Sequence, residues 1–407
     1  MNVPRSGHAG DQAVKTVYLH VGAPATGTAF LQQTLWDNRL RLGDAGVCYP
    51  VAGPLEHFGA VMDLREMAWG GRRDPAWDGA WDRMAQRARD WDGHTVIFSQ
   101  GLLGGATEQQ VKRAVADLEP AKVHVVYMTR HLGWQLIVDW QEHLRHGHTI
   151  TFESFVDDLV ERGIKAPKPY GELFWGLHDP ERVLQVWETA VPSDRIHVIT
   201  LPPPGDSAGP DLVWERFCAL TGIEAGAFDV SATPEDEPLS ATEAEILRRL
   251  NTKIAPLLGT DHKRMVRQYL VGHGLADGAD AVGHLAMGLP ARHADWAAER
   301  TRQLTGALRA GGYQVVGDLD ELVTSPRPEP ARQPEDLPDE LIATAFIGVV
   351  AHLLERLSDG HARIGLAHLN SQLAGVQENL DRLIETAAAP SPALQRAARR
   401  AAGRRAP

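Results

Sequence analysis

The sequence has few cysteines, no long apolar run and no excess of positive charge, and each absence excludes a class of protein. The two cysteines among 407 residues, Cys48 and Cys218, lie in apolar segments and cannot define a disulfide framework. The polar start has no apolar core of the kind found in secretory signals, and no run of about 18 apolar residues occurs. The formal net charge of −12 argues against nucleic acid or an anionic membrane as a partner. We therefore expect a cytoplasmic protein that spans no membrane.

A strand, a glycine-bounded loop and a helix follow one another in residues 16–31. The apolar run Val17 to Val21 predicts a buried strand, and helical periodicity begins at Phe30. Loop N–H groups and a helix dipole converge at such a junction and form an anion site. The spacing Gly22-x4-Gly27 resembles that of a P-loop. A kinase is disfavoured, because no lysine follows the second glycine and no Mg²⁺ carboxylate is obvious.

Further short apolar strands alternate with segments of helical periodicity. Strands are predicted at 46–49, 95–99, 122–128 and 195–201, and helices begin after Thr107, Thr151 and the capping-box sequence Ser240 to Glu243. This alternation predicts an α/β fold with a central parallel sheet. Trp77 and Trp81, at helical spacing, are interpreted as packing residues rather than a wall for an acceptor.

The chain divides by composition into five parts. We predict a flexible N-terminus at 1–14, an α/β domain at 15–325, a proline-rich linker at 326–338, a helical hairpin or coiled-coil extension at 339–389 and a basic flexible tail at 390–407. Apolar residues in the extension repeat at spacings of three and four, as Leu366, Leu369, Leu373, Val376, Leu380 and Leu383. This seam is too short to decide between folding back on the preceding helix or the core and forming a homodimer.

The strand, the pattern His-x-Gly-x-Pro-x-Thr-Gly-Thr and the helix together resemble the first loop of sulfotransferases. The resemblance covers roughly residues 15–325, and stretches near 138–143, 201–205 and 313–320 resemble actinobacterial members. It implies a P-loop-like three-layer sulfotransferase fold with a C-terminal helical extension. It also implies the cofactor PAPS (3′-phosphoadenosine-5′-phosphosulfate), with PAP as product and no metal. The family loop, Pro-Lys-(Ser/Thr)-Gly-Thr-(Thr/Ser), here reads Pro24-Ala25-Thr26-Gly27-Thr28-Ala29, so the lysine is replaced by alanine.

The resemblance also implies the cofactor-binding positions. Arg130 would bind the 3′-phosphate as a fork, but the serine expected eight residues later is Val138. The third strand ends in Ser99-Gln100-Gly101, where relatives often carry Ser-His-Glu, and glutamine cannot accept a proton. A structural ion pair for Arg130 and a capping role for Ser99 remain open. The full set of positions is Gly22, Ala23, Pro24, Ala25, Thr26, Gly27, Thr28, Ala29, Ser99, Arg130 and Val138.

His20 and His57 are the candidate catalytic bases. A structural role is open for both: His20 belongs to a strand, whereas similar sequences carry a histidine facing the acceptor cavity at the position of His57. The sequence His143-Leu-Arg-His146-Gly-His148 straddles a predicted helix end. It lacks a completing cysteine or carboxylate, so we interpret it as a helix cap and expect no metal site.

Two functions follow from this reading. The first is PAPS-dependent transfer of a sulfuryl group to a hydroxyl or amine of a small-molecule acceptor. The alternative is a catalytically silent or repurposed sulfotransferase fold that binds or converts a different ligand. The departures at Ala25, Gln100 and Val138 support this alternative.

Overall fold

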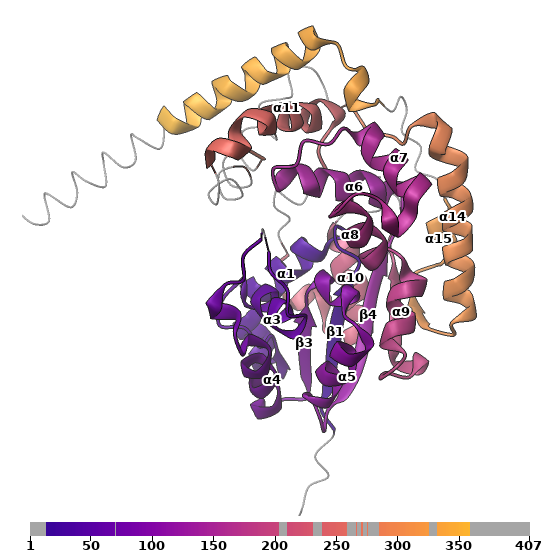
Figure 1. Cartoon of the computed structure of the whole chain (residues 1–407). Helices are drawn as coiled ribbons and strands as arrows, with labels where there is room; N and C mark the ends of the chain where they lie inside the picture. Colours follow the sequence, from indigo (N-terminus) through magenta and orange to yellow (C-terminus); the bar gives the residue numbers. More distant parts are fainter. Residues whose placement is uncertain are drawn as a thin grey trace, which may run out of the picture.

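The structure is a computed structural model and is shown in Figure 1. It describes residues 14–69, 71–202, 210–230, 238–258, 285–324 and 332–358, with the single positions Val266, Leu270, Val271 and Leu275. Most of the predicted N-terminal segment, part of the predicted linker, the apolar seam and the basic tail lie outside these residues.

Six parallel strands form the central sheet in the order β2-β3-β1-β4-β5-β6. Their bounds are β1 Thr16–Gly22, β2 Val47–Cys48, β3 Thr95–Ser99, β4 Lys122–Thr129, β5 Ile196–Thr200 and β6 Gln314–Val316. The predicted α/β class with a parallel sheet is confirmed, and the five predicted strands are β1 to β5. The short edge strand β6 was not predicted as a strand.

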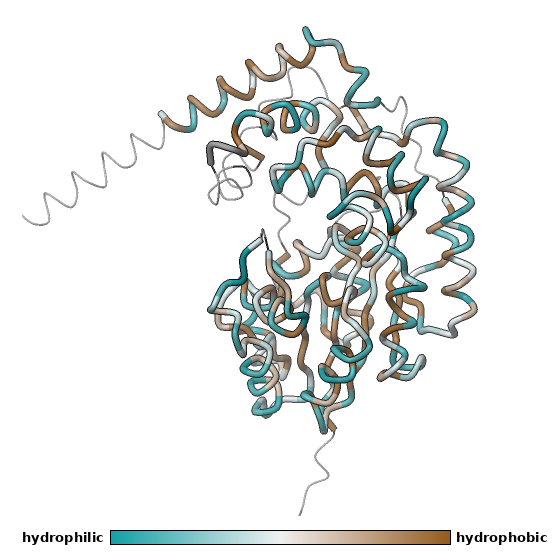
Figure 2. Tube along the Cα trace, viewed as in Figure 1, coloured by the Kyte–Doolittle hydropathy of each residue, from teal (hydrophilic) through white to brown (hydrophobic). Residues whose placement is uncertain are grey.

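Helices cover both faces of the sheet, as Figure 1 shows. On one face, α1 (Thr28–Asp37), α2 (Arg39–Asp44) and α10 (Pro210–Thr221) pack in a cluster with Ile97, Val126 and Ile199. On the other face lie α3 (Glu56–Leu64), α4 (Ala80–Asp90), α5 (Glu108–Ala116) and α9 (Pro180–Trp187). Figure 2 shows the hydrophobic residues concentrated in the strands between these layers. Strands buried on both faces are expected to be almost continuously apolar.

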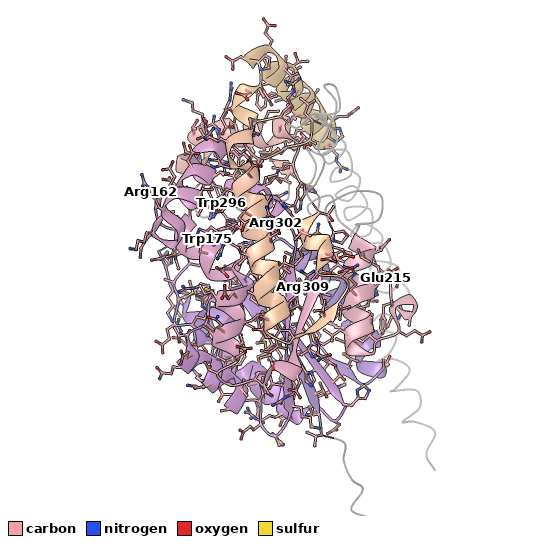
Figure 3. The ribbon with its side chains drawn as sticks, turned by 90° about the vertical axis from the view of Figure 1, so that its right-hand side faces the viewer. Arg162, Trp175, Glu215, Trp296, Arg302 and Arg309 are labelled. Carbon is pink, nitrogen blue, oxygen red and sulfur yellow. The ribbon has the colours of Figure 1, made fainter. Side chains whose placement is uncertain are left out.

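A helical lobe with its own core lies beyond the carboxyl ends of the strands. It contains α6 (Leu132–Arg145), α7 (Phe152–Arg162), α8 (Tyr170–Leu177), α11 (Ala241–Leu258) and the helix Asp339–Ser358. The long helix α14 (Ala291–Ala310) joins the lobe to the sheet domain, with Leu304 in the lobe core and Leu308 in the sheet core. Figure 3 shows this helix running along one side, from Trp296 beside Trp175 to Arg309.

Polar side chains fix the helix starts where the sequence predicts them. Thr107 makes a capping box with Gln110, and Thr151 accepts a hydrogen bond from the amide of Ser154. Ser240 and Glu243 bond each other's amides at 2.6 and 3.3 Å. Each cap satisfies N–H groups that a helix cannot satisfy internally.

The tryptophan-rich segment packs into the fold. Trp81 is buried against Phe98 and donates its indole N–H to Asp117 at 2.9 Å. The rings of Trp69 and Trp77 meet Phe58 edge-on. These contacts confirm the interpretation of Trp77 and Trp81 as packing residues.

The end of the predicted linker packs against the helical lobe. Arg332 donates its amide to the carbonyl of Ala286 at 2.9 Å, and Pro334 and Leu337 are buried. Glu335 accepts from the amide of Phe152 and thereby caps α7. The helix that follows is Asp339–Ser358, and its most apolar stretch of 18 residues has a mean hydropathy of 1.5 and is 17% buried. By length and composition alone this helix could cross a membrane, and its Ile342, Ala345 and Val349 are buried in the core of the helical lobe.

Candidate functional site

Strand order brings three chain segments together at the carboxyl edge of the sheet. β1 lies between β3 and β4, with His20 paired to Ser99 on one side and to Val126 on the other. The loop after β1, the end of β3 and the end of β4 therefore share one edge, where open parallel sheets bind ligands. This places the predicted loop 22–29, Ser99 and Arg130 in one region.

The loop after β1 is held by its own threonines. The Oγ1 atoms of Thr26 and Thr28 donate to the carbonyl of Ala23 at 2.7 and 3.1 Å, and both side chains are buried. The amide of Ala23 donates to Met128 of β4 at 2.8 Å. Thr26 and Thr28, which the resemblance places among the cofactor-binding positions, donate their hydroxyl hydrogens within the loop itself.

The backbone of the loop presents a row of free donors. Among the described residues, no acceptor bonds the N–H groups of residues 25–30, which lead into the first turn of α1. Amides without partners at a helix N-terminus favour an anion through both hydrogen bonding and the helix dipole. Ala25, at φ 56°, is partly exposed and adds no charge.

Gly27 is required by the close packing of the loop. Its φ is +89°, and a Cβ at this position would lie 2.8 Å from the side chain of Val213 on α10. Both the positive φ and the contact exclude a larger residue. Gly27 therefore fixes how closely the loop approaches α10.

Three side chains converge on Ser99 at the end of β3. The Nδ1 of His20 lies 2.8 Å from its Oγ, and Gln32 of α1 donates to its carbonyl at 2.8 Å. The Nδ1 of His57 lies 3.2 Å from the carbonyl and 3.3 Å from the amide of Ser99. Ser99 is fully buried, so its hydroxyl orients His20 rather than reaching a ligand.

Both candidate bases are enclosed. Burial lowers the pKa of His20 to about 4 and that of His57 to about 3, so both imidazoles are neutral at pH 7. The His57 ring packs edge-on against Tyr49 and stacks on Phe98. Each Nε2 is buried without a hydrogen-bond partner among the described residues. In this structure both imidazoles contact Ser99 at the end of β3.

Gln100 and Gly101 start a short 3₁₀ helix, η2 (Gly101–Gly105). The Oε1 of Gln100 accepts from the amide of Leu102 at 3.4 Å. A Cβ on Gly101 would lie 3.2 Å from the ring of Pro24. Gly101 thus packs closely against Pro24 of the loop, and the amide side chain of Gln100 cannot act as a base.

Arg130 follows β4 and has no anionic partner among the described residues. Its Nε is buried and unbonded, and loss of hydration lowers its pKa to about 10, so the guanidinium stays charged at pH 7. The neighbouring His131 caps α6 by accepting from Gly133. A desolvated cation without a partner is unfavourable unless an anion binds it. No ion pair supports the structural alternative for Arg130 in the described part of the chain.

Val138 is buried on α6 and offers no hydroxyl. The neighbouring Asp139 has a structural role instead, with its carboxylate 3.2 Å from His178 and 3.5 Å from His143. Burial opposes its ionisation, but bonds from the two imidazoles outweigh that effect and hold the pKa of Asp139 well below its ordinary value. The contact between Asp139 and His178, the C-cap residue of α8, joins α6 to α8.

The predicted histidine cap is present at the end of α6. His146 is the C-cap residue, and its Nδ1 lies 2.8 Å from the carbonyl of Glu142. His148 pairs with the hydroxyl of Tyr170 at 3.0 Å. No three His, Cys, Asp or Glu side chains in the described ranges lie close enough to hold a metal ion.

Sequence reasoning missed Gln32, His131 and Asp139. Gln32 and Asp139 act through contacts with residues 67 and 39 positions away, which no local pattern reveals. His131 directly precedes a helix and could have been recognised as a cap from that position alone.

Replacing Gly27 by alanine tests the packing of the loop. We expect Gly27→Ala to lower the free energy of unfolding by about 1–2 kcal/mol more than Gly222→Ala, measured by urea denaturation. Gly222 is the matched control, because its φ is +75° and no atom lies within 4 Å of its added Cβ. Equal losses would show that α10 does not constrain the loop.

The buried His57 predicts a specific dependence of stability on pH. Its pKa in the folded protein, about 3, lies below the ordinary value of 6.5. The unfolded chain therefore binds the proton first, and stability falls as the pH drops below 6.5. In His57→Asn, the loss of stability between pH 8 and pH 5 should be smaller than in wild type by about 2 kcal/mol.

Tyr49→Phe is the control for that experiment. It alters the same packing, yet the pKa of Tyr49 is raised by burial and this hydroxyl does not titrate between pH 5 and 8. An unchanged pH dependence in His57→Asn would mean that the imidazole is not held neutral.

Comparison with known proteins gives one distant structural likeness. No family model matches the chain, and no curated protein matches it. The crystal structure of a sulfotransferase from Alicyclobacillus acidocaldarius is similar at 16% sequence identity and a TM-score of 0.35. The match covers 59% of this chain and 94% of that chain. At this identity and TM-score the likeness carries no functional argument, so any function must be argued from the site residues.

Proposed function

We propose that the protein binds PAPS and transfers its sulfuryl group to a hydroxyl or amine of a small-molecule acceptor. The proposal is carried by the row of amides at residues 25–30 on the same sheet edge as Arg130, where neither the amides nor the guanidinium has a partner among the described residues. Two separate anion-binding features fit a nucleotide with a charged group at each end. The sequence of the loop, which resembles that of sulfotransferases, selects PAPS among such nucleotides.

Each feature has a definite task in this proposal. The amides of the loop and the N-terminus of α1 would bind the 5′-phosphosulfate, and the guanidinium of Arg130 would bind the 3′-phosphate. When bound, PAPS supplies the sulfuryl group. The chain positions this donor through a loop that Ala23, Thr26 and Thr28 hold in place.

The leaving phosphate is the weak point of the site. Negative charge develops there during transfer, and Ala25 supplies no cation to stabilise it. Loss of such a group costs a few kcal/mol, or about a hundredfold or more in rate. Among the described residues around the loop, the groups that remain to stabilise this charge are the loop amides and the dipole of α1.

The alternative is a fold that retains anion binding without sulfuryl transfer. It is favoured by the enclosure of His20 and His57, which leaves no exposed base at the ends of β1 and β3. Such a protein would bind a nucleotide or a phosphorylated ligand at the same loop.

Titration with two related nucleotides separates these readings. We expect PAP to bind wild type at least about tenfold more tightly than 5′-AMP, since the two differ only in the 3′-phosphate that Arg130 would bind. Arg130→Ala should reduce PAP affinity to that of 5′-AMP and leave 5′-AMP unchanged, as measured by calorimetry.

Two results would contradict the proposal. If the wild-type protein did not bind PAP, the assignment of PAPS as the cofactor would be wrong, and the site would bind a different ligand. If Arg130→Ala lowered the affinities for PAP and for 5′-AMP by the same factor, the guanidinium would attract anions at the site in general and would not bind the 3′-phosphate specifically.

Restoring the missing cation tests the weak point directly. Ala25→Lys should tighten PAP binding about tenfold, because a charge-assisted hydrogen bond contributes roughly 1.5–3 kcal/mol. The backbone at φ 56° already accommodates a side chain, and the position is partly exposed.

Ala29→Lys provides the matched control, since it adds the same charge at an exposed position in the first turn of α1. If both variants tighten binding equally, added charge alone explains the gain, and position 25 has no special relation to the bound phosphate.

A further inference from the structure

Helix α6 lies above the carboxyl edge of the sheet, where the candidate site is. It starts directly after β4, and its 14 residues give it a length of about 21 Å. The three strand spacings from β4 to β2 add up to about 14 Å. Figure 1 shows the helix above the strand ends. A helix of this length can therefore reach from β4 past the ends of β1 and β3.

The start of α6 is fixed in a buried core. His131 caps the helix, and the amide of Leu132 donates to the hydroxyl of Thr301 on α14 at 3.4 Å. Leu132 is buried in the core of the helical lobe, and Leu308 of α14 is buried in the core of the sheet domain. Moving this end of α6 away from the sheet would therefore open both cores.

The far end of α6 meets a tryptophan of the sheet domain. The rings of Trp69 and His146, the C-cap residue of α6, meet edge-on with their centroids 5.8 Å apart. Trp69 lies in the segment between α3 and α4, and α3 reaches the end of β3 through the contact of His57 with Ser99. The ring pair thus joins the lobe to the sheet domain at the end of α6, whereas α14 joins them at its start.

The backbone around Trp69 fixes the position of its ring. Trp69 and Arg72 exchange both backbone hydrogen bonds, at 2.8 and 3.1 Å, and Gly71 has a φ of +76°. The guanidinium of Arg73 donates to the carboxylate of Asp63 on α3 at 3.0 Å. These bonds tie the segment to α3, so the ring is placed by the sheet domain and not by the lobe.

The two ends of α6 differ in how strongly they are held. Trp69 and His146 are both partly exposed, and one aromatic pair shifts an equilibrium by about a factor of ten at most beyond the area it buries. Opening the start of the helix would instead expose buried residues of two cores. The contact of Trp69 with His146 is therefore the weaker one and separates first.

We propose that the contact between Trp69 and His146 is a latch that closes the candidate site and opens when a ligand enters or leaves. When the rings separate, the end of α6 can move away from the loop after β1, while its start stays fixed on α14. When the rings meet again, α6 covers the ligand and excludes water. The opening itself needs no particular ligand, and its effect on nucleotide release rests on the proposed function.

Fluorine NMR of the ligand-free, full-length chain tests the opening. After incorporation of 5-fluorotryptophan, the resonances of Trp69 and Trp81 are assigned from Trp69→Phe and Trp81→Phe. We expect relaxation dispersion on the microsecond-to-millisecond timescale for Trp69. Trp81 is the control, because it is fully buried against Phe98 and should show none. Equal behaviour of the two rings would overturn the latch.

Release of PAP tests the effect of the latch on the site. In Trp69→Ala the dissociation rate constant of PAP, followed by stopped flow, should rise about three- to tenfold. Trp77→Ala is the matched control, because Trp77 packs on the same Phe58 and makes no ring contact with His146 in the described part of the chain. The control should release PAP at the wild-type rate.

A double-mutant cycle shows whether the two rings act through one contact. His146→Ala and the double variant should then release PAP at the rate of Trp69→Ala. Additive increases would overturn the latch, and so would equal acceleration in Trp77→Ala, since the effect would come from packing around Phe58. If the wild-type protein did not bind PAP, the proposed function would fail, and the fluorine measurement would still decide the latch.

Discussion

The candidate site depends on the backbone of Ala23. Its carbonyl accepts both threonine hydroxyls, and its amide donates to Met128 of β4. One peptide unit thus ties the loop to the neighbouring strand and closes the loop on itself. Because the two hydroxyls satisfy this carbonyl, it needs no backbone N–H as a donor, and the N–H groups of residues 25–30 have no acceptor among the described residues. The proposed anion site is a consequence of that closure.

Ser99 is the corresponding centre on the other side of β1. His20, Gln32 and His57 reach it from β1, α1 and α3, so three elements meet at one buried residue. Neutral imidazoles serve this purpose well, because each ring nitrogen can donate or accept without the cost of burying a charge. His20 and His57, the two candidate bases in the sequence, therefore also have a structural role, because their hydrogen bonds hold the end of β3.

The sequence predicted most of the fold and only part of the site. Continuous apolar runs such as 17–21 and 122–128 identify central strands, and the cap residues Thr107 and Thr151 mark helix starts, because these signals are local. β6 has three residues and an exposed pattern, which gives little periodicity to detect. The sequence does not specify the backbone angles that point the hydroxyls of Thr26 and Thr28 back at Ala23. The contact of His57 with Ser99 joins residues 42 positions apart, so no local pattern predicts it.

The charges at the site affect binding and catalysis differently. In the proposed function, the loop amides and Arg130 would bind a nucleotide with a charged group at each end as strongly before the reaction as during it, so they would contribute uniform binding. Rate acceleration requires groups that interact more strongly as charge builds up on the leaving phosphate. In the sulfotransferase loop that this sequence resembles, a lysine occupies the place where such a group would act, and this chain has Ala25 there. A site of this composition therefore loses catalytic rate before it loses affinity, which is why nucleotide affinity and transfer rate must be measured separately in this protein.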